Sequence, residues 1–191
     1  SKTLVVDELK LPDTWILSVP GMHNRYNAAL ALAVTRTLSI SDDVSRRALE
    51  SFTGVPGRLE FIEEKKGVKI YNDTTATTPE ATLVALSALD PAQTILIMGG
   101  ADKGLDMNAL LVKLPEVKRV ILLAGTGTSR VLEFISGASV FDDLEKAVNE
   151  AFASAREGDI ILFSPAFASF GMFKNEYDRG DQFNALVNSH D

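Results

Sequence analysis

Three short, almost wholly apolar runs constrain the fold of this chain more than any other feature. The runs are TILIM (94–98), VILLA (120–124) and IILFS (160–164). Strands of this composition are buried on both faces, as they are in parallel sheets. Segments with helical periodicity separate the runs, and strand–helix alternation implies right-handed βαβ units. The sequence therefore predicts an α/β fold with an open, mostly parallel, doubly wound, Rossmann-like sheet and flanking helices.

The order of elements after Arg58 follows from this alternation. The segment LEFIEEKKGVKIYND predicts two strands joined by a turn near Lys66 and Gly67. The elements expected beyond it are helix 78–89, strand 94–98, helix 105–113, strand 117–123, helix 127–135, strand 138–141, helix 144–156, strand 159–163 and helix 171–187.

The first 55 residues show a different pattern. Apolar runs at 4–6 and 15–19 predict two strands, and two strands alone are marginally stable in water, so they indicate the end of a larger sheet in a longer protein. A helix over 22–38, apolar on most sides, is expected to be buried. A second helix follows, with Ser41 or Asp42 as its cap. The GVPG sequence at 54–57 predicts a boundary between 1–55, a remnant of a second α/β domain, and 56–191, one further domain.

Composition excludes several classes of function. Hydrophobic residues make up 46% of the chain and charged residues 24%, which is typical of a globular protein with a core. The net charge of −7 argues against nucleic-acid or membrane partners, which require basic patches. Without cysteine, and with two histidines, the chain offers no disulfide, thiolate nucleophile or zinc site of the usual kinds. No apolar stretch reaches the length of a membrane span and no signal peptide is evident, so a cytoplasmic location is the default expectation.

Polar clusters follow the predicted strands, where an open parallel sheet binds its ligands. The first cluster, DTTATTPE, contains Asp73 and the threonines Thr74, Thr75, Thr77 and Thr78. Its hydroxyls and carboxylate suit an anion or a ribose at a helix N-terminus. The simpler interpretation, which we favour for the cluster taken alone, is helix capping, in which Thr78 precedes Pro79.

The second cluster, GGADKGLD, follows the strand at 94–98. Gly99 and Gly100 allow a close backbone approach and Lys103 supplies a cation, although an ordinary strand–helix turn fits equally well. The motif GxxxxGK[ST] of phosphate-binding loops occurs nowhere in the 191 residues. The third cluster, GTGTSR, favours a structural role, because it lacks the third glycine of a dinucleotide fingerprint.

The last cluster, SPAFASFGMFKNEYDRG, places Ser164 and Ser169 among small and aromatic residues. No GxSxG motif supports a serine hydrolase, whereas a small-residue loop at a strand end can cradle a carboxylate. Near the start of the chain, Asn24 and Asn27 share a helix face in GMHNRYN. Their amides suit the edge of an adenine, and a capped helix with solvated asparagines explains them equally well.

These segments, in this order, resemble the Mur ligase family from about Gly21 to the end of the chain. GMHNRYNAALALA is similar to the family's adenine-side helix, and FTGVPGRLE to the hinge that carries an arginine, here Arg58. IYNDTTATTPEAT, LIMGGADKGLD and LFSPAFASFGMFKNEYDRGDQF are similar to the branch that adds D-glutamate.

The resemblance implies an ATP-dependent, ADP-forming ligase that joins D-glutamate to UDP-N-acetylmuramoyl-L-alanine in peptidoglycan precursor synthesis. It implies that residues 1–55 end a central ATP-binding domain, and that ATP and magnesium serve a monomeric parent protein. Asn24 and Asn27 would contact adenine, Arg58 the phosphates and Asp73 the ribose. The D-glutamate carboxylates would be held by three side chains and by backbone amides near Phe170; the side chains are those of Thr77, Lys103 and Ser169.

Two residues depart from the family pattern. Thr75 stands where this branch often has a lysine, and Glu176 where it often has an aromatic residue. Because no phosphate-binding loop is present in these 191 residues, we expect this polypeptide alone to be inactive.

There are two alternatives to the truncated ligase: a stand-alone, non-catalytic module that binds a small molecule or nucleotide, and a Rossmann-type oxidoreductase. The second is disfavoured because no glycine fingerprint opens the sheet.

Overall fold

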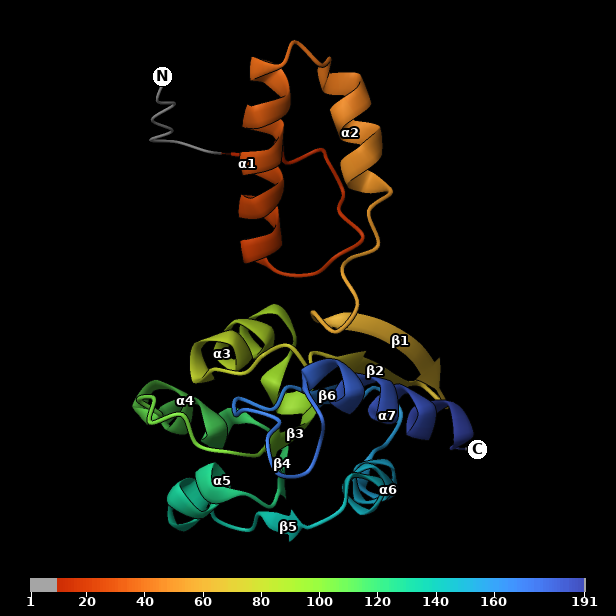
Figure 1. Ribbon diagram of the computed structural model, residues 1–191. Coiled ribbons are helices and arrows are strands. Elements are labelled where there is room, and N and C mark those ends of the chain that lie inside the picture. The colour runs from red at the N-terminus through yellow and green to blue at the C-terminus, as the bar shows by residue number, and fades with distance from the viewer. Residues whose placement is uncertain (1–9, 191) are drawn as a thin grey trace. The chain divides into compact units, whose positions relative to one another are not determined.

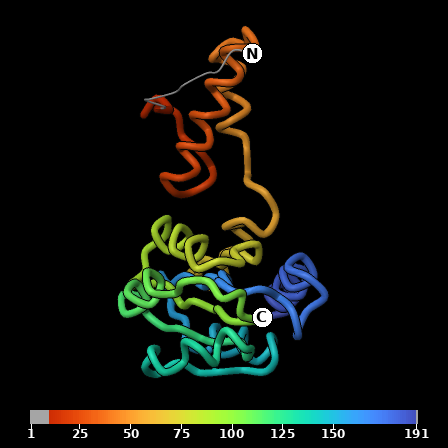
Figure 2. The backbone as a smooth tube through the Cα atoms, turned by 60° about the vertical axis from the view of Figure 1, so that its left-hand side comes forward, coloured from red at the N-terminus to blue at the C-terminus, as the bar shows by residue number. Residues whose placement is uncertain are grey.

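The computed structural model describes residues 10–190, which belong to two compact units, Ser1–Gly54 and Val55–Asp191 (Figure 1). The division falls within one residue of the predicted boundary. Residues 52–54, between the last helix of the first unit and the first strand of the second, form neither helix nor strand (Figure 2). The identity of the first unit as the end of a central domain stays a prediction.

A six-stranded sheet forms the centre of the second unit, in the order β1-β2-β6-β3-β4-β5. The strands are β1 (Glu60–Lys65), β2 (Val68–Asn72), β3 (Thr94–Gly99), β4 (Arg119–Leu123), β5 (Ser139–Phe141) and β6 (Ile160–Phe163). All neighbouring strands are parallel except β1 and β2, which form an antiparallel pair around the turn at Lys66 and Gly67. The mostly parallel α/β sheet predicted from the apolar runs is confirmed.

Helices cover both faces of this sheet (Figure 1). One face carries α3 (Pro79–Ala88), α4 (Asn108–Lys113) and α5 (Thr126–Val131), and the other carries α6 (Leu144–Ser154) and α7 (Glu176–Ser189). Short 3-10 turns occupy Pro91–Gln93, Leu114–Glu116 and Leu132–Phe134. Strand β3 shows why its sequence is continuously apolar: Leu96 and Met98 face the first layer of helices, whereas Ile95 and Ile97 face the second.

The strand order brings distant segments of the chain together. Strand β6, late in the chain, lies between β2 and β3 and is parallel to both. The loops that follow these three strands therefore leave the same edge of the sheet side by side. We call residues 73–78, 100–107 and 164–175 the edge loops.

The first unit contains α1 (Met22–Thr37) and α2 (Asp42–Glu50). Ser41 caps α2, because its hydroxyl accepts a hydrogen bond from the Val44 amide. A small apolar cluster packs α1 against the chain that precedes it, and its buried members are Leu11, Trp15, Ala28, Ala29 and Leu32.

The strand predicted at 15–19 is wrong, and the strand predicted at 4–6 lies outside the described residues. Residues 15–19 form no regular element, although Trp15 is buried. The Trp15 carbonyl accepts from the Arg25 guanidinium, which also donates to the preceding carbonyls of Leu11 and Pro12. Trp15 and the partly buried Leu17 of this run pack in the cluster with α1, whereas Ile16 is exposed.

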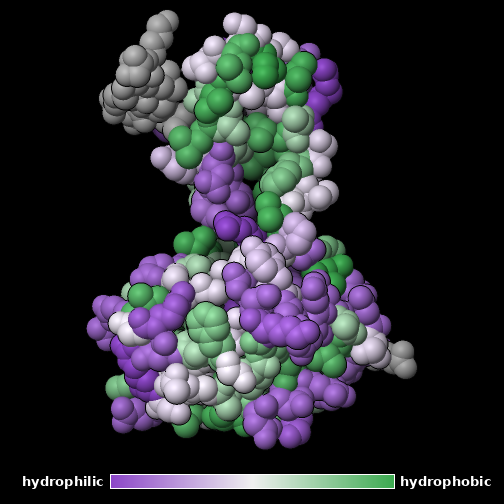
Figure 3. All heavy atoms as spheres, in the orientation of Figure 1, coloured by the Kyte–Doolittle hydropathy of each residue, from purple (hydrophilic) through white to green (hydrophobic). Residues whose placement is uncertain are grey.

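The prediction that α1 is buried holds for one side of the helix only. Met22, Tyr26, Leu30 and Val34 are exposed, and their spacing of four residues places them on one stripe of α1. Figure 3 shows apolar residues gathered at the surface of this unit.

Three predicted helices begin or end three or more residues from the expected position. The helix predicted from 171 begins at Glu176, because the Asn175 side chain accepts hydrogen bonds from the Tyr177 and Asp178 amides. The helix predicted from 105 begins at Asn108, where the Asp106 carboxylate accepts from the Asn108 amide. The helix predicted over 127–135 ends in the 3-10 turn Leu132–Phe134.

Candidate functional site

The edge loops are joined to one another by backbone hydrogen bonds. Ala101 and Ala168 exchange two such bonds, of 2.9 and 3.1 Å, between the loop after β3 and the loop after β6. The Ala166 amide donates to the Ala76 carbonyl at 2.9 Å, which connects the loop after β6 to the loop after β2. The structure thus brings together the three segments in which the sequence placed a carboxylate site.

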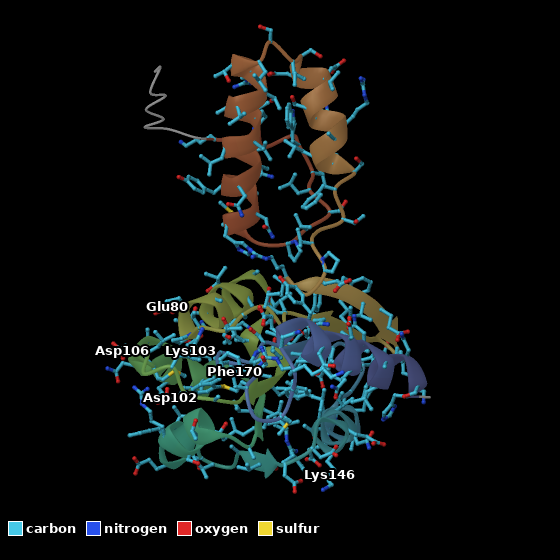
Figure 4. All side chains as sticks on the ribbon, viewed as in Figure 1. Glu80, Asp102, Lys103, Asp106, Lys146 and Phe170 are labelled. Atoms are coloured by element: carbon cyan, nitrogen blue, oxygen red, sulfur yellow. The ribbon has the colours of Figure 1, made fainter. Side chains whose placement is uncertain are left out.

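Lys103 and Thr77 meet at this edge, although 26 residues separate them in the chain. The Lys103 ammonium donates a hydrogen bond to the Thr77 hydroxyl at 3.1 Å, and the lysine is exposed to solvent. Figure 4 shows Lys103 among Glu80, Asp102, Asp106 and Phe170, with Lys146 elsewhere on α6. An exposed ammonium beside a hydroxyl is a suitable pair for one carboxylate, because the cation adds charge to the hydrogen bond.

Ser169 and Phe170 follow Ala168 directly, so the pairing of Ala168 with Ala101 fixes them beside the loop of Lys103. The Ser169 side chain is only 4% exposed, whereas Phe170 is 70% exposed. The Ser169 hydroxyl hydrogen-bonds to no other described residue, so it is available as a donor. Phe170 can cover a ligand bound at the edge.

The backbone that carries Lys103 is held by the cluster GTGTSR. The Asp102 amide donates to the Thr126 hydroxyl at 3.0 Å, and the Asp102 carboxylate pairs with the Arg130 guanidinium at 3.1 Å. The carboxylate also accepts from the Gly104 amide, and this hydrogen bond, with the charge of Arg130, lowers the pKa of Asp102. The structural role predicted for GTGTSR is confirmed, because this cluster holds the loop that carries Lys103.

Gly99 and Gly100 allow a close approach, but the partner is another part of the protein. A Cβ on Gly100 would lie 2.4 Å from the Ala168 carbonyl oxygen, and one on Gly99 would lie 2.3 Å from the Leu123 carbonyl oxygen. Both residues have positive φ angles, 130° at Gly99 and 139° at Gly100. Gly100 therefore allows two edge loops to pack, and Gly99 allows the end of β3 to pack against β4.

The hydroxyls of the first cluster are divided among several tasks. Thr78 caps α3 through the Ala81 amide, as predicted. Thr74 donates to the Glu176 carbonyl at 2.7 Å and Thr75 donates to the Gly57 carbonyl at 2.8 Å. Among the described residues, the Thr77 hydroxyl bonds to Lys103 alone.

Asp73 is buried, with 7% of its surface exposed. One carboxylate oxygen accepts from the Leu59 amide at 2.9 Å and the other accepts from the Ser164 hydroxyl at 2.8 Å. Burial raises the pKa of Asp73 to about 6, against the opposing effects of these two hydrogen bonds and of the Arg58 charge. The ribose role of Asp73 stays a prediction, and the structure shows in addition that this carboxylate binds the backbone next to Arg58.

Arg179 is a functional candidate that the sequence did not reveal. It is fully buried, and its guanidinium donates to the Thr74 hydroxyl, the Thr74 carbonyl and the Phe167 carbonyl at 3.1, 2.7 and 3.2 Å. Burial lowers the pKa of Arg179 to about 10, so it remains protonated at neutral pH. A buried cation is costly unless it is hydrogen-bonded. Arg179 therefore fixes the loop after β2 to the loop after β6.

No local signal in the sequence identifies Arg179. A charged residue in the first turns of a helix ordinarily faces solvent. Its partner Thr74 lies 105 residues earlier in the chain, and only the strand order brings the two together.

The other residues predicted to bind the nucleotide are Asn24, Asn27 and Arg58. In the first unit, the Asn24 amide group donates to the Pro20 carbonyl at 2.7 Å, and Asn27 is exposed. Helix α1 begins after Gly21 without a side-chain cap, so the Asn24 bond is not a capping bond, and the adenine role of both asparagines stays a prediction. In the second unit, Arg58 is exposed and its amide donates to the Val55 carbonyl in a tight turn.

A cavity of about 440 Å³ lies at the opposite edge of the sheet, near the beginnings of β3 and β4. Two of the cations that line it are already paired, Lys118 with Asp159 and Arg119 with Glu150. We therefore place the candidate site at the edge loops and not in this cavity.

Within residues 10–190, no three histidine, aspartate or glutamate side chains are grouped so as to hold a metal ion. None of the helices in this range has the length and apolar character required to cross a membrane.

Comparisons with known proteins define the class to which this fold and site belong. A family profile described as "Mur ligase, glutamate ligase domain" matches residues 57–167, more than half of the chain. The chain belongs to the Mur ligase family, and the resemblance inferred from its motifs is confirmed.

Curated relatives specify the similarity further. The chain is 43% identical over 177 residues to a UDP-N-acetylmuramoylalanine--D-glutamate ligase from Roseiflexus sp. (strain RS-1), a match that covers 88% of this chain and 38% of that protein. It is 34% identical over 190 residues to the ligase of the same name from Aquifex aeolicus (strain VF5), covering 98% of this chain and 46% of that protein. The chain thus spans less than half the length of these relatives.

Solved structures share the fold. A Mur ligase from Thermotoga maritima in complex with ADP superposes with a TM-score of 0.61 at 26% identity, covering 85% of this chain and 38% of that one. The bifunctional folylpolyglutamate synthase/dihydrofolate synthase of Yersinia pestis CO92 gives a TM-score of 0.69 at 22% identity, covering 93% and 41%.

Proposed function

We propose that the whole protein containing this chain is an ATP-dependent ligase that joins D-glutamate to UDP-N-acetylmuramoyl-L-alanine in peptidoglycan precursor synthesis. The observation that carries the proposal is the contact between Lys103 and Thr77 at the sheet edge, beside the loop of Ser169. Relatives named for this reaction, at up to 43% identity in the matches above, support the assignment of substrate.

In the proposed reaction, ATP phosphorylates the carboxylate of the L-alanine residue. The amine of D-glutamate attacks the acyl phosphate, the amide bond forms, and ADP and phosphate are released. The edge loops hold the incoming D-glutamate. Lys103 pairs with one of its carboxylates, and the hydroxyls of Thr77 and Ser169, with backbone amides near Phe170, donate to the carboxylate oxygens.

The contribution of this chain is positioning. Holding the amine in attack geometry supplies several kcal/mol of the barrier in well-oriented reactions, up to roughly 7–11. The backbone hydrogen bonds between Ala101 and Ala168 suit this task, because they keep the donors in place before the substrate binds.

For the nucleotide, we assign Asn24 and Asn27 to the adenine, Arg58 to the phosphates and Asp73 to the ribose. The solved Thermotoga maritima relative binds ADP, which supports a nucleotide for the whole protein. Magnesium is expected with ATP, but the described residues offer no cluster of ligands for it, so no step is assigned to a metal here. A cytoplasmic monomer follows from the proposal as an expectation.

The test is amide formation by the whole protein. It should release phosphate only when ATP, UDP-N-acetylmuramoyl-L-alanine and D-glutamate are all present, and L-glutamate should not replace D-glutamate. The 191-residue chain alone should release no phosphate above a protein-free control. A whole protein that binds D-glutamate yet forms no amide would instead favour the non-catalytic binding module.

A further inference from the structure

The backbone on both sides of Arg58 is held by other segments. On one side, the Gly57 carbonyl accepts from the Thr75 amide at 3.0 Å and from the Thr75 hydroxyl at 2.8 Å, and the Gly57 amide donates to the Glu60 carboxylate at 2.8 Å. On the other side, the Leu59 amide donates to the Asp73 carboxylate at 2.9 Å. Both peptide units that flank Arg58 are therefore fixed.

This segment has an unfavourable backbone conformation. Gly57 has a φ angle of 70° and Leu59 one of 44°, and the left-handed region disfavours leucine. Leu59 is buried in the core beneath α3 and α4, so its side chain also resists rearrangement. Such a conformation persists only where its surroundings over-determine it, and it is common at sites that must present a group to a ligand.

The side chain between these fixed units is exposed. The Arg58 guanidinium forms no hydrogen bond or ion pair with another described residue. A fixed backbone that carries an exposed cation is the arrangement expected for a group that binds an anionic ligand and must not drift away from it.

We propose that Thr75 and Asp73 are positioning residues, which hold the backbone of Arg58 so that its guanidinium meets the phosphates of the nucleotide. This inference rests on the proposed function, which supplies the nucleotide. It also accounts for Thr75 at a position where the family resemblance leads one to expect a lysine: the hydroxyl acts through the Gly57 carbonyl instead of touching the nucleotide itself.

The test uses three threonine variants of the whole protein. Thr75→Val removes the hydroxyl with little change of shape, and Thr75→Ser keeps a hydroxyl. Thr94→Val is the matched control, because the Thr94 hydroxyl also donates to a backbone carbonyl, that of Asp90 at 2.7 Å, but at the opposite end of β3. Thr75→Val should raise the KM for ATP about fivefold, the effect of one neutral hydrogen bond, with the KM for D-glutamate and kcat little changed. Thr75→Ser should recover most of this loss, and Thr94→Val should match the wild type.

A second measurement needs no ligand. In the 191-residue chain, amide hydrogen exchange at Leu59 and Thr75 should be faster in Thr75→Val than in the wild type and in Thr94→Val. An unchanged KM for ATP in an active Thr75→Val protein would overturn the inference, and so would unchanged exchange at these amides. If the wild-type whole protein forms no amide, the proposed function fails, and the exchange rates alone then decide whether Thr75 holds this backbone.

Discussion

At the scale of single residues, the candidate site contains charged groups of two kinds. Lys103 is exposed and bonds to a hydroxyl, so its charge is available to a ligand. Asp73 and Arg179 are buried, and every contact they make is internal to the protein. The first kind is suited to binding and the second to fixing the loops, a role that Asp73 would combine with its proposed contact to the ribose. Substitutions should separate the two roles.

Replacing Lys103 tests the binding role. In the whole protein, Lys103→Ala should raise the KM for D-glutamate about tenfold, because a charged hydrogen bond is worth roughly 1.5–3 kcal/mol. The KM for ATP should change little. Lys146→Ala is the matched control, since Lys146 is an exposed lysine on α6 paired with Asp142 (Figure 4). A well-folded Lys103→Ala protein with an unchanged D-glutamate KM would remove the lysine from the site.

Replacing Asp73 tests the fixing role through pH. Burial raises the pKa of this carboxyl from 3.8 to about 6, so the folded state holds the proton more tightly than the unfolded state. The free energy of unfolding that Asp73 contributes is therefore highest below about pH 4 and falls as the pH rises through 6. The loss is on the order of 3 kcal/mol.

Asp73→Asn should abolish this loss. The amide can still accept from the Leu59 amide and can donate to the Ser164 hydroxyl. Urea unfolding of both proteins at acid and neutral pH should show the stability of the variant rising relative to the wild type as the pH increases. A difference that does not depend on pH would show that Asp73 titrates normally in the folded state.

At the scale of elements, the sheet could be predicted and the joining of its loops could not. TILIM, VILLA and IILFS form β3, β4 and β6. These strands are buried on both faces, so their residues are continuously apolar, and such a run can be recognised in the sequence. The run at 15–19 leaves a similar trace without forming a strand. Its Trp15 carbonyl bonds to Arg25, a tertiary contact that apolar periodicity does not encode.

Part of the candidate site could be predicted from the sequence and part could not. The positions of Thr77, Lys103 and Ser169 at strand ends are local features, and parallel topology places strand ends at one edge. The hydrogen bonds of Asp73 with Leu59 and Ser164 span 14 and 91 residues. Such contacts depend on β6 entering between β2 and β3, and no local pattern specifies that order.

Two glycines of the loop after β3 test the packing of the edge loops. Gly100→Ala would place a Cβ 2.4 Å from the Ala168 carbonyl oxygen, so the loops must separate. We expect a loss of stability of roughly 1–3 kcal/mol from overpacking, in addition to the cost of positive φ. Gly104→Ala is the control: its φ is 70° but nothing lies within 4 Å, so only the cost of a left-handed residue remains, about 1–2 kcal/mol. Equal losses in urea unfolding would contradict the close packing of the two loops.

At the scale of the whole molecule, the chain consists of two units joined by a short segment without regular structure. Residues 51–53, 55 and 56 in this segment are exposed, whereas from Gly57 onward the backbone is bonded to residues 60, 73 and 75. Limited proteolysis should therefore cut first between residues 51 and 56 and release a stable fragment that starts before Gly57. First cleavage within the edge loops would contradict both the boundary and the rigidity of the site.

In the proposed function, the edge loops of the second unit bind D-glutamate. The most direct measurement is a titration of the isotope-labelled 191-residue chain with D-glutamate, followed by NMR. We expect saturable shifts of the amides of Thr77, Lys103, Ser169 and Phe170, weaker shifts of the same amides with L-glutamate, and none at Lys146. Saturable shifts centred on another part of the chain, or no shift at the edge loops at the highest D-glutamate concentration used, would refute binding of D-glutamate at these loops.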